Sequence, residues 1–394
     1  MSVRMQAWLI VGTLVAAVFL SSPYAFLPNA GRPSGQPKPD FLAFYSAGTL
    51  LREDRANLYD EQKQAGVQSA AVGEPITPAH PGFMPFVYPA LAALLFLPLA
   101  LLPYPAAFVT MLVVNVLLCG FALDLLRRKF KLSDAGGRLL VISAALSIPV
   151  ILTLANGQVS FLVLFLLIML VSDIRAGRAR AGVWTGLLAF KPTLMPVFLL
   201  RSAMRREWKS LAYTAITATA VLLASLALAG PQAMADYWDM SVKMAEGQYS
   251  TANAAHMMNL RSISEFLGYG RTGALLLSLV VLALAAFSLR ETSDASCSAL
   301  ILAALLVAPH LHYQDLNPLW IVIAMGLGAS TSITPLWRWS VFGGTLLTTV
   351  LVFTLASRQS SLPILPVGLL AVFLALTLKS WTKPQAAVQI PTEG

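Results

Sequence analysis

Charged residues are scarce in this sequence. They make up 11% of its 394 residues, against about 25% in ordinary soluble domains. Apolar residues make up 57%, and the mean hydropathy is +0.72. This balance predicts an integral membrane protein that is all-α, because an open strand leaves backbone groups unsatisfied in lipid. No soluble domain is left on which nucleic acid would dock, so we expect no nucleic-acid partner despite the net charge of +9.

Cysteine and histidine are also rare. Cys119 and Cys297 are the two cysteines, and both fall in apolar stretches that predict buried packing residues. Four histidines without a cysteine pair do not make a zinc ligand set, so we expect no metal. The sequence has no P-loop, no GxGxxG and no GxSxG, which argues against ATP or NAD as cofactor and against serine hydrolysis. We expect no cofactor.

Long apolar stretches are abundant and set the predicted architecture. The stretch at 7–27 is about 20 residues long and lacks a small-residue cleavage site, so it indicates an uncleaved membrane helix and not a signal peptide. Two stretches are ambiguous, since 88–102 is short and 181–200 is interrupted by Lys191-Pro192. We expect about 10 to 12 transmembrane or re-entrant helices in a single domain, 1–394. The remaining stretches are 105–126, 138–155, 158–172, 210–229, 273–290, 297–309, 317–330, 339–356 and 363–379.

The distribution of charge predicts the orientation. The basic clusters at 127–131, 175–180 and 201–209 are nearly free of acids, whereas loops 28–87 and 231–272 contain ten of the 18 acids. The positive-inside rule places the clusters in the cytoplasm and both loops outside. In this arrangement the short 88–102 piece enters the membrane and returns, and the Lys191 segment is two half-helices.

An acid stands at the start of a helical pattern shortly after the first apolar stretch, in PDFLAFYSAGTLLRED. Phe41, Phe44, Tyr45 and Gly48 lie on one helical face, which we expect at the membrane interface, facing lipid. Asp40 before them is expected to cap the helix. Its carboxylate could also take the proton from a hydroxyl that arrives from the aqueous side.

Two further polar sites interrupt apolar segments. Lys191 lies about ten residues from either end of its segment, so its ammonium is expected at a helix break that faces a cavity, where it suits a phosphate. In LANGQVS, Asn156 and Gly157 predict a tight turn. Gln158 follows this turn and could donate hydrogen bonds into a site.

The outer loops carry the remaining candidates. LLVAPHLHYQDLNP contains His310 and His312. Either one of these imidazoles faces a phosphate, or the segment is an ordinary interfacial loop. The second outer loop contains His256, Asn259 and Arg261. Arg261 either clamps a phosphate with two hydrogen bonds or is a solvated arginine beside the membrane.

These pieces, taken in order, resemble glycosyltransferase family 87, the polyprenyl-phosphate-mannose-dependent α-mannosyltransferase group with the membrane-embedded C-type (GT-C) fold. Six segments carry the resemblance over most of the chain. They are DFLAFYSAGTLL with NLYD (40–60), FVYPALAALLFLPLALLPY (86–104), NGQVSFLVLFLL (156–167), AGVWTGLLAFKPTLMPVFLL with RREWK (181–209), GPQAMADYWDM with NLRSISEFL (230–267) and APHLHYQDLNPL (308–319). GQVS departs from the family pattern, because it has Ser160 where asparagine is commoner.

The resemblance implies a GT-C-like helical bundle that transfers a hexose, mannose foremost, from a polyprenyl-phosphate donor with inversion. The acceptor would be a hydroxyl of a glycolipid or glycan at the extracytoplasmic face of a bacterial inner membrane. Asp40 matches the general base. Lys191 and His310 are the first candidates to contact the leaving phosphate, and His312, Arg261 and Gln158 are further candidates. Further expected substrate-binding residues are Asn156, Tyr45, His256 and Asn259.

Two other functions share parts of this pattern. A lipid-linked sugar transporter or flippase would also need many helices and a buried cation, but it would not need an acid at the membrane surface and would often show paired halves. An O-antigen ligase or polymerase would use a pyrophosphate donor and would be expected to carry more arginines in its outer loops. The type of donor separates these alternatives.

Overall fold

The computed structural model describes residues 38–249, 254, 257–288, 292–328, 343–344 and 363–381. Every element in these ranges is an α-helix or a 3-10 helix, which confirms the all-α prediction for this part of the chain. The apolar stretch at 7–27 and nearly all of the stretch at 339–356 lie outside the described residues.

Two described helices are long and apolar enough to cross a membrane, namely α6 (Tyr104–Lys129) and α12 (Trp208–Glu246). A third span results if α7 (Asp134–Ala145) and α8 (Ile148–Asn156) are counted together, although they meet at a bend of 53°. The sequence predicts a single apolar stretch at 138–155, whereas the structure has two helices there. Ser147 and Pro149 lie at this bend, where proline at the first turn favours the start of a new helix. The number of 10 to 12 membrane segments stays a prediction.

The segment predicted as the second outer loop begins as a helix. In α12, Gly230 has φ 87° and ψ 169°, and Pro231 follows it, so the helix bends there and then continues to Glu246. We call residues 231–246 the α12 arm. The rest of the predicted loop contains α13 (Leu260–Phe266) and the start of α14 (Gly270–Ser288). Much of 231–272 is therefore ordered helix.

The described part of the segment predicted as the first outer loop is also largely helical and is packed into the protein. It contains α3 (Phe41–Glu53), η1 (Arg55–Asn57) and α4 (Glu61–Val72). The prediction that the aromatic face of α3 lies against lipid is wrong for Phe41 and Phe44, which pack inside the protein. Phe41 is 0% and Phe44 1% exposed, because the Phe41 ring packs on Phe108 and the Phe44 ring stacks on Phe96.

The ambiguous piece 88–102 is not one continuous helix. It holds the four-residue α5 (Ala90–Ala93) and the 3-10 turn η2 (Leu99–Leu101). α5 packs on α12, and η2 packs on α3 and α6. The close contact with α3 depends on Gly48, where a Cβ would lie 2.6 Å from the Phe96 carbonyl oxygen.

The predicted break at Lys191-Pro192 is confirmed. Helix α10 (Ala181–Leu187) and η3 (Leu188–Phe190) end before it, and η4 (Pro192–Leu194) and α11 (Met195–Met204) follow. Lys191 itself has the non-helical angles φ −134° and ψ 76°. Pro192 lacks an N–H and disfavours a helical conformation in the residue before it, which is why the helix stops here.

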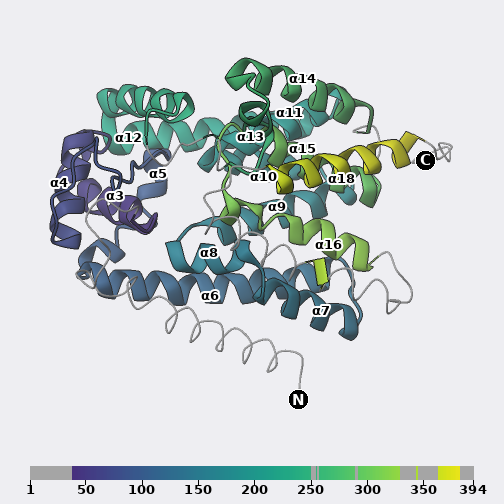
Figure 1. The fold of residues 1–394 in the computed structure, drawn as a ribbon, viewed down its shortest axis with the longest axis horizontal. Coiled ribbons are helices and arrows are strands. Elements are labelled where there is room, and N and C mark those ends of the chain that lie inside the picture. The colour runs from purple at the N-terminus through teal and green to yellow at the C-terminus, as the bar shows by residue number, and fades with distance from the viewer. Residues whose placement is uncertain are drawn as a thin grey trace.

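The remaining helices complete the bundle around these elements. Figure 1 shows α3, α4 and α5 together at one end of the molecule, near α12, with α16 and α18 at the other end and α6 running along one side. The other described elements are α9 (Ser160–Arg175), α15 (Asp294–Val307), η7 (Tyr313–Leu316), α16 (Leu319–Gly328) and α18 (Ile364–Trp381). α15 is buried over almost its whole length and forms the centre of the larger apolar core.

Helix α10 approaches α12 through a pair of glycines four residues apart. A Cβ at Gly182 would lie 1.9 Å from the carbonyl oxygen of Ser210, and one at Gly186 would lie 2.6 Å from the Cβ of Thr217. The Thr214 hydroxyl donates to the Gly182 carbonyl at 3.0 Å, which a larger residue would not allow. Small residues spaced this way are the usual means by which membrane helices pack closely.

Replacing Gly182 by alanine should therefore destabilise the protein. The added methyl group forces α10 and α12 apart, at a cost of about 1–3 kcal/mol or more. We expect a lower melting temperature in detergent. The matched control is Gly66→Ala in α4, where no atom lies within 4 Å of the new Cβ. That control should be neutral or stabilising, and equal melting of the two variants would contradict the assigned packing.

Candidate active site

Asp40 lies at the junction between the first outer segment and two distant turns. Its Oδ2 accepts hydrogen bonds from Gln158 Nε2 at 3.0 Å and from Gln314 Nε2 at 3.2 Å. The predicted helix cap is not formed, since the Asp40 side chain makes no cap hydrogen bond. Asp40 already has helical angles (φ −58°, ψ −24°), so its carboxylate turns away from the first N–H groups of α3 and towards the two amides.

A glycine allows Gln158 to reach Asp40. Gly157 ends α8 with φ 62°, a left-handed conformation that suits glycine. A Cβ at this position would lie 2.7 Å from the Cβ of Phe41, so only glycine lets the turn lie against the start of α3. The turn predicted at Asn156-Gly157 is present, and it brings Gln158 beside Asp40.

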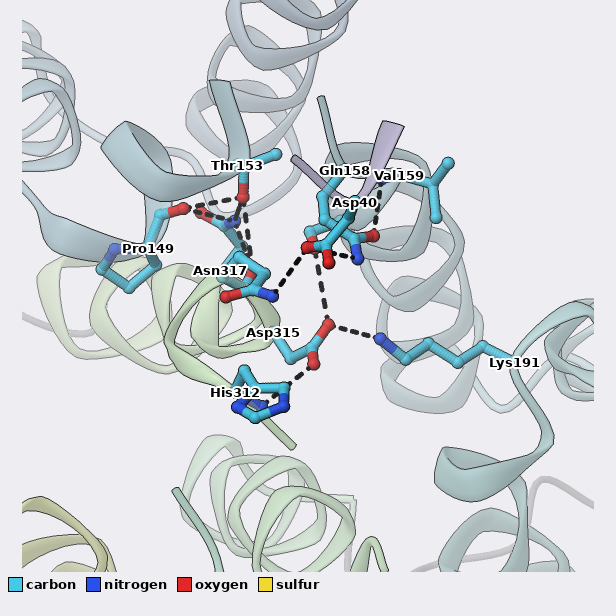
Figure 2. A network of polar contacts seen from close by, with 11 residues as sticks. Asp40, Pro149, Thr153, Gln158, Val159, Lys191, His312, Asp315 and Asn317 are labelled. Atoms are coloured by element: carbon cyan, nitrogen blue, oxygen red, sulfur yellow. Dashed lines mark hydrogen bonds and ion pairs between the residues drawn. The ribbon is translucent and has the colours of Figure 1, made fainter. Parts of the chain in front are cut away.

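The Lys191 ammonium forms an ion pair with Asp315. Both side chains are well buried, at 12% exposed for Lys191 and 7% for Asp315. Asp315 also accepts from the His312 backbone N–H at 3.1 Å and from Ser160 Oγ at 3.5 Å. Figure 2 shows the two carboxylates close together, with Asp40 on the side of Gln158 and Asp315 on the side of Lys191.

The side-chain amide of Asn317, which we call the amide clamp, fixes the position of η7 and of Asp315 within it. Asn317 Nδ2 donates to Thr153 Oγ1 at 2.8 Å, to the Gln314 carbonyl at 3.0 Å and to the Pro149 carbonyl at 3.3 Å (Figure 2). The clamp joins the short 3-10 turn to α8, and thereby sets Gln314 and Asp315 against the turn that carries Gln158.

These residues line one cavity of about 300 Å³. Its polar side contains Asp40, Gln158, Lys191, Gln314 and Asp315, together with the two histidines of the 308–312 loop. Its other walls are mostly apolar and come from segment 84–88 and from the α12 arm. The residues of these two segments that line the cavity include Met84, Pro85, Val87, Tyr88, Tyr237, Trp238, Met244 and Ala245.

Both histidines lie in the cavity wall. The rings of His310 and His312 meet edge to face, with centroids 4.6 Å apart. Burial lowers the pKa of His310 to about 3, and His312 beside it acts in the same direction. His310 is therefore a neutral imidazole at pH 7, which can donate a hydrogen bond but carries no positive charge.

The two carboxylates differ in acidity. Burial raises the pKa of Asp40 above its ordinary 3.8, and the negative charge of Asp315 adds to this, while the Gln158 hydrogen bond, His312 and Lys191 oppose it. Burial acts on Asp315 in the same way, but its ion pair with Lys191 outweighs burial and lowers the pKa of Asp315. Asp40 is thus the better base, and Asp315 the permanent anion.

Two residues of the predicted second outer loop bond the backbone of the loop 308–312, which carries the two histidines. Asn259 Nδ2 donates to the Ala308 carbonyl at 2.6 Å, and its Oδ1 accepts from the Arg261 N–H at 3.0 Å, which caps α13. Arg261 Nη1 donates to the Ala245 carbonyl at 3.0 Å and to the Pro309 carbonyl at 3.5 Å. Neither side chain lines the cavity, so the structure does not bring the predicted Arg261 clamp to a substrate phosphate.

Two more predicted substrate-binding residues, Asn156 and Tyr45, do not line the cavity. Asn156 is the last residue of α8, and the Tyr45 hydroxyl donates to the Leu102 carbonyl at 3.0 Å. His256 lies outside the described residues. Within the described ranges no group of three or more His, Cys, Asp or Glu side chains could hold a metal ion.

Asp315 and Gln314 line the cavity but are not among the site residues predicted from the sequence. Both stand in the quoted loop HLHYQDLNP, where an acid in a short turn between two apolar stretches was the available signal. Tyr88, Tyr237 and Trp238 were also missed, since aromatic residues in outer segments are common near membranes and carry no specific signal.

Comparison with known proteins gives one match. The model of glycosyltransferase family 87 matches residues 86–311, which is more than half of the chain. No curated protein and no solved structure matches. The matched range includes Gln158, Lys191 and His310 from the cavity, whereas Asp40 and Asp315 lie outside it. On this match, the chain belongs to glycosyltransferase family 87.

Proposed function

We propose that this glycosyltransferase transfers a hexose, mannose foremost, from a polyprenyl-phosphate sugar to a hydroxyl of a glycolipid or glycan. The transfer takes place at the extracytoplasmic face of a bacterial inner membrane and inverts the anomeric centre. The observation that carries this proposal is the meeting of Asp40 and Lys191 in one cavity, from segments that are far apart in sequence. A base and a cation that line the same cavity suit the two ends of a glycosyl transfer.

Asp40 acts on the acceptor. Both amides bond its Oδ2, which leaves Oδ1 for the acceptor hydroxyl. As the hydroxyl oxygen forms its bond to the anomeric carbon, the proton passes to Asp40. A carboxyl with a raised pKa accepts a proton more readily than an ordinary aspartate, and a positioned base of this kind contributes about 10²–10⁴-fold in rate.

Lys191 acts on the donor. When the bond between the anomeric carbon and the phosphate oxygen breaks, the phosphate gains a negative charge. An ammonium fixed at this place stabilises the transition state more than the ground state, which is the requirement for catalysis. Asp315 holds the ammonium in position through their ion pair. His310 and His312 line the same cavity, where their ring N–H groups can donate to the leaving oxygen.

The apolar walls support a lipid-linked donor. Phe44, Met84, Val87, Phe190 and Met244 line the cavity beside the polar cluster. An isoprenoid chain needs apolar surface next to its phosphate, whereas a nucleotide-sugar would need a base-binding and pyrophosphate-binding site. The absence of glycine-rich phosphate loops from the sequence agrees with a polyprenyl monophosphate.

Changing Asp40 to asparagine should abolish transfer without unfolding the protein. Asparagine retains a carbonyl oxygen for the two glutamine amides but cannot accept the hydroxyl proton. We expect a loss of about 10²–10⁴-fold, measured on purified protein in detergent with radiolabelled polyprenyl-phosphate mannose and membrane lipids as acceptors. The melting temperature should stay the same.

The matched control for this experiment is Asp60→Asn. Asp60 lies in the same outer segment but caps α4, accepting from the Lys63 N–H at 2.8 Å. Asparagine also caps helices well, so this variant should transfer like the wild type. Wild-type rates in Asp40→Asn would remove Asp40 as the base. A wild type that transfers from no polyprenyl-phosphate sugar would overturn the proposed function.

The acid limb of the pH profile of transfer should depend on the negative charge of Asp315. Transfer needs the ionised form of Asp40, so kcat/KM should fall tenfold per pH unit below the pKa of Asp40, which lies above 3.8. Asp315→Asn removes a neighbouring negative charge, so the pKa of Asp40 drops. The acid limb of the profile should then move to lower pH by ~0.5–1 unit.

This shift does not depend on how much of the variant folds, because the midpoint of the limb is independent of enzyme concentration. Loss of one partner of a buried ion pair costs about 3–5 kcal/mol, so Asp315→Asn should also melt earlier. The control is Asp239→Asn, an exposed acid on the α12 arm that does not line the cavity. An unchanged limb in Asp315→Asn would show that the two carboxylates do not interact.

A further inference from the structure

The hydroxyl of Tyr88 is a polar group in the cavity wall that the fold does not use. Tyr88 lines the cavity, and its backbone carbonyl accepts from the Tyr59 hydroxyl at 2.7 Å, but its own hydroxyl bonds none of the described residues. The hydroxyl oxygen is also not among the polar atoms that are buried without a partner in the described ranges. It therefore keeps accessible surface and is free to bond a ligand.

Aromatic contacts fix the Tyr88 ring between the two halves of the site. Its centroid lies 5.3 Å from that of Phe44 and 5.3 Å from that of Phe190. Phe44 follows Asp40 by about one turn, at the start of α3. Phe190 directly precedes Lys191 at the helix break. Phenylalanine would make both ring contacts equally well, so the packing does not explain the hydroxyl.

Charged groups on both sides of the site act on the Tyr88 hydroxyl. Burial has the largest effect and raises the pKa of Tyr88 to about 12. The charge of Lys191 opposes this rise, and those of Asp315 and Asp40 add to it. Because such effects weaken with distance, the hydroxyl faces the polar side of the cavity, within range of all three charges. The phenol stays protonated at pH 7 and has a proton to donate.

From this arrangement we propose that the Tyr88 hydroxyl hydrogen-bonds a hydroxyl of the sugar that is transferred, and so helps to select that sugar. This inference rests on the proposed function and adds a specificity residue to it. In an inverting transfer the acceptor attacks the anomeric carbon on the face opposite to the leaving group. The transferred sugar then lies between Asp40 and Lys191, where the Tyr88 ring is held.

The chemistry of a phenol suits this role. Its hydroxyl donates one hydrogen bond and also accepts, as a sugar hydroxyl does, so the two groups pair in either direction. A site built to bond a substrate hydroxyl rejects an analogue that lacks it, because a polar group of the site is then left without a partner. Tyr88 would thus distinguish sugars by the position of one hydroxyl, whereas Lys191 recognises the phosphate whatever sugar it carries.

The test uses Tyr88→Phe, which keeps the ring and removes the hydroxyl. The melting temperature without ligand should equal that of the wild type, because the hydroxyl bonds none of the described residues. The kcat/KM for polyprenyl-phosphate mannose should fall about tenfold, equivalent to about 1.4 kcal/mol, with the KM for the acceptor unchanged. Wild-type kcat/KM for the donor in this variant would overturn the inference.

The matched control is Tyr249→Phe. The Tyr249 hydroxyl donates to Glu61 Oε1 at 2.8 Å, and Tyr249 does not line the cavity. This variant loses a hydrogen bond of the fold, so it should melt earlier than the wild type and transfer with the same kcat/KM. An equal fall in kcat/KM in both variants would overturn the inference, because it would reflect a general effect of removing a tyrosine hydroxyl.

Donors that lack one sugar hydroxyl test the contact itself. Wild type and Tyr88→Phe are compared on mannosyl donors that lack the hydroxyl at C2, C3, C4 or C6. For the donor that lacks the partner of Tyr88, the two enzymes should have the same kcat/KM, since the bond is already absent; for the other donors the tenfold difference should remain. A purely structural effect of Tyr88→Phe would lower kcat/KM by the same factor for every donor, and that result would overturn the inference.

A binding measurement separates this inference from the proposed function. Farnesyl-phosphate mannose should raise the melting temperature of the wild type and of Asp40→Asn more than farnesyl phosphate does, because only the former carries the sugar. In Tyr88→Phe this extra stabilisation should shrink, while the effect of farnesyl phosphate stays that of the wild type. If the wild type transfers no sugar but this pattern holds, the proposed function fails and the sugar contact stands. The same extra stabilisation in wild type and Tyr88→Phe would overturn the inference.

Discussion

The buried ion pair between Lys191 and Asp315 is the interaction on which the rest of the site depends. A charge in a largely apolar protein is costly unless a partner of opposite charge is held beside it. The partner here is 124 residues away in sequence. The two side chains can meet only if the helix breaks at Lys191-Pro192 and the short turn η7 is fixed against α8. Specific residues achieve both. Pro192 stops the helix, and Asn317 with Thr153 holds the turn.

This pair also gives two neighbouring carboxylates different chemical roles. Asp315, beside the ammonium, stays ionised, whereas Asp40, held by two neutral amides, has a raised pKa. One acid therefore serves as a fixed counter-charge and the other is able to take up a proton. Opposite perturbation of a carboxylate pair is a common way for a protein to separate a base from an electrostatic support. The neutral His310 adds a hydrogen-bonding group without changing this balance.

Apart from Asp40, the two long segments predicted as outer loops, 28–87 and 231–272, supply the scaffold of the cavity and little of its polar lining. Gln64 and Gln68 on α4 bond the backbone of Phe86 and Met84, and so hold the segment 84–88 that lines the cavity. Lys243 pairs with Glu61 at 2.7 Å and ties the α12 arm to the same helix, α4. Asn259 and Arg261 likewise bond backbone carbonyls. Polar residues of the outer loops that resemble ligands in the sequence thus mainly satisfy backbone groups that would otherwise be buried without partners.

The sequence by itself determined the features that depend on local or average properties. The apolar composition predicts helices, Lys191-Pro192 predicts the break, Asn156-Gly157 predicts the turn, and the ordered motifs predict the family. Only the tertiary structure decided which polar groups meet. Whether Asp40 caps α3 or bonds Gln158 and Gln314 depends on contacts across 118 and 274 residues. The same holds for Arg261, which bonds carbonyls, and for Tyr88, whose hydroxyl bonds none of the described residues. Hydrogen bonds act over about 3 Å, so their partners follow from the packed arrangement of distant segments and not from the spacing of residues along the chain.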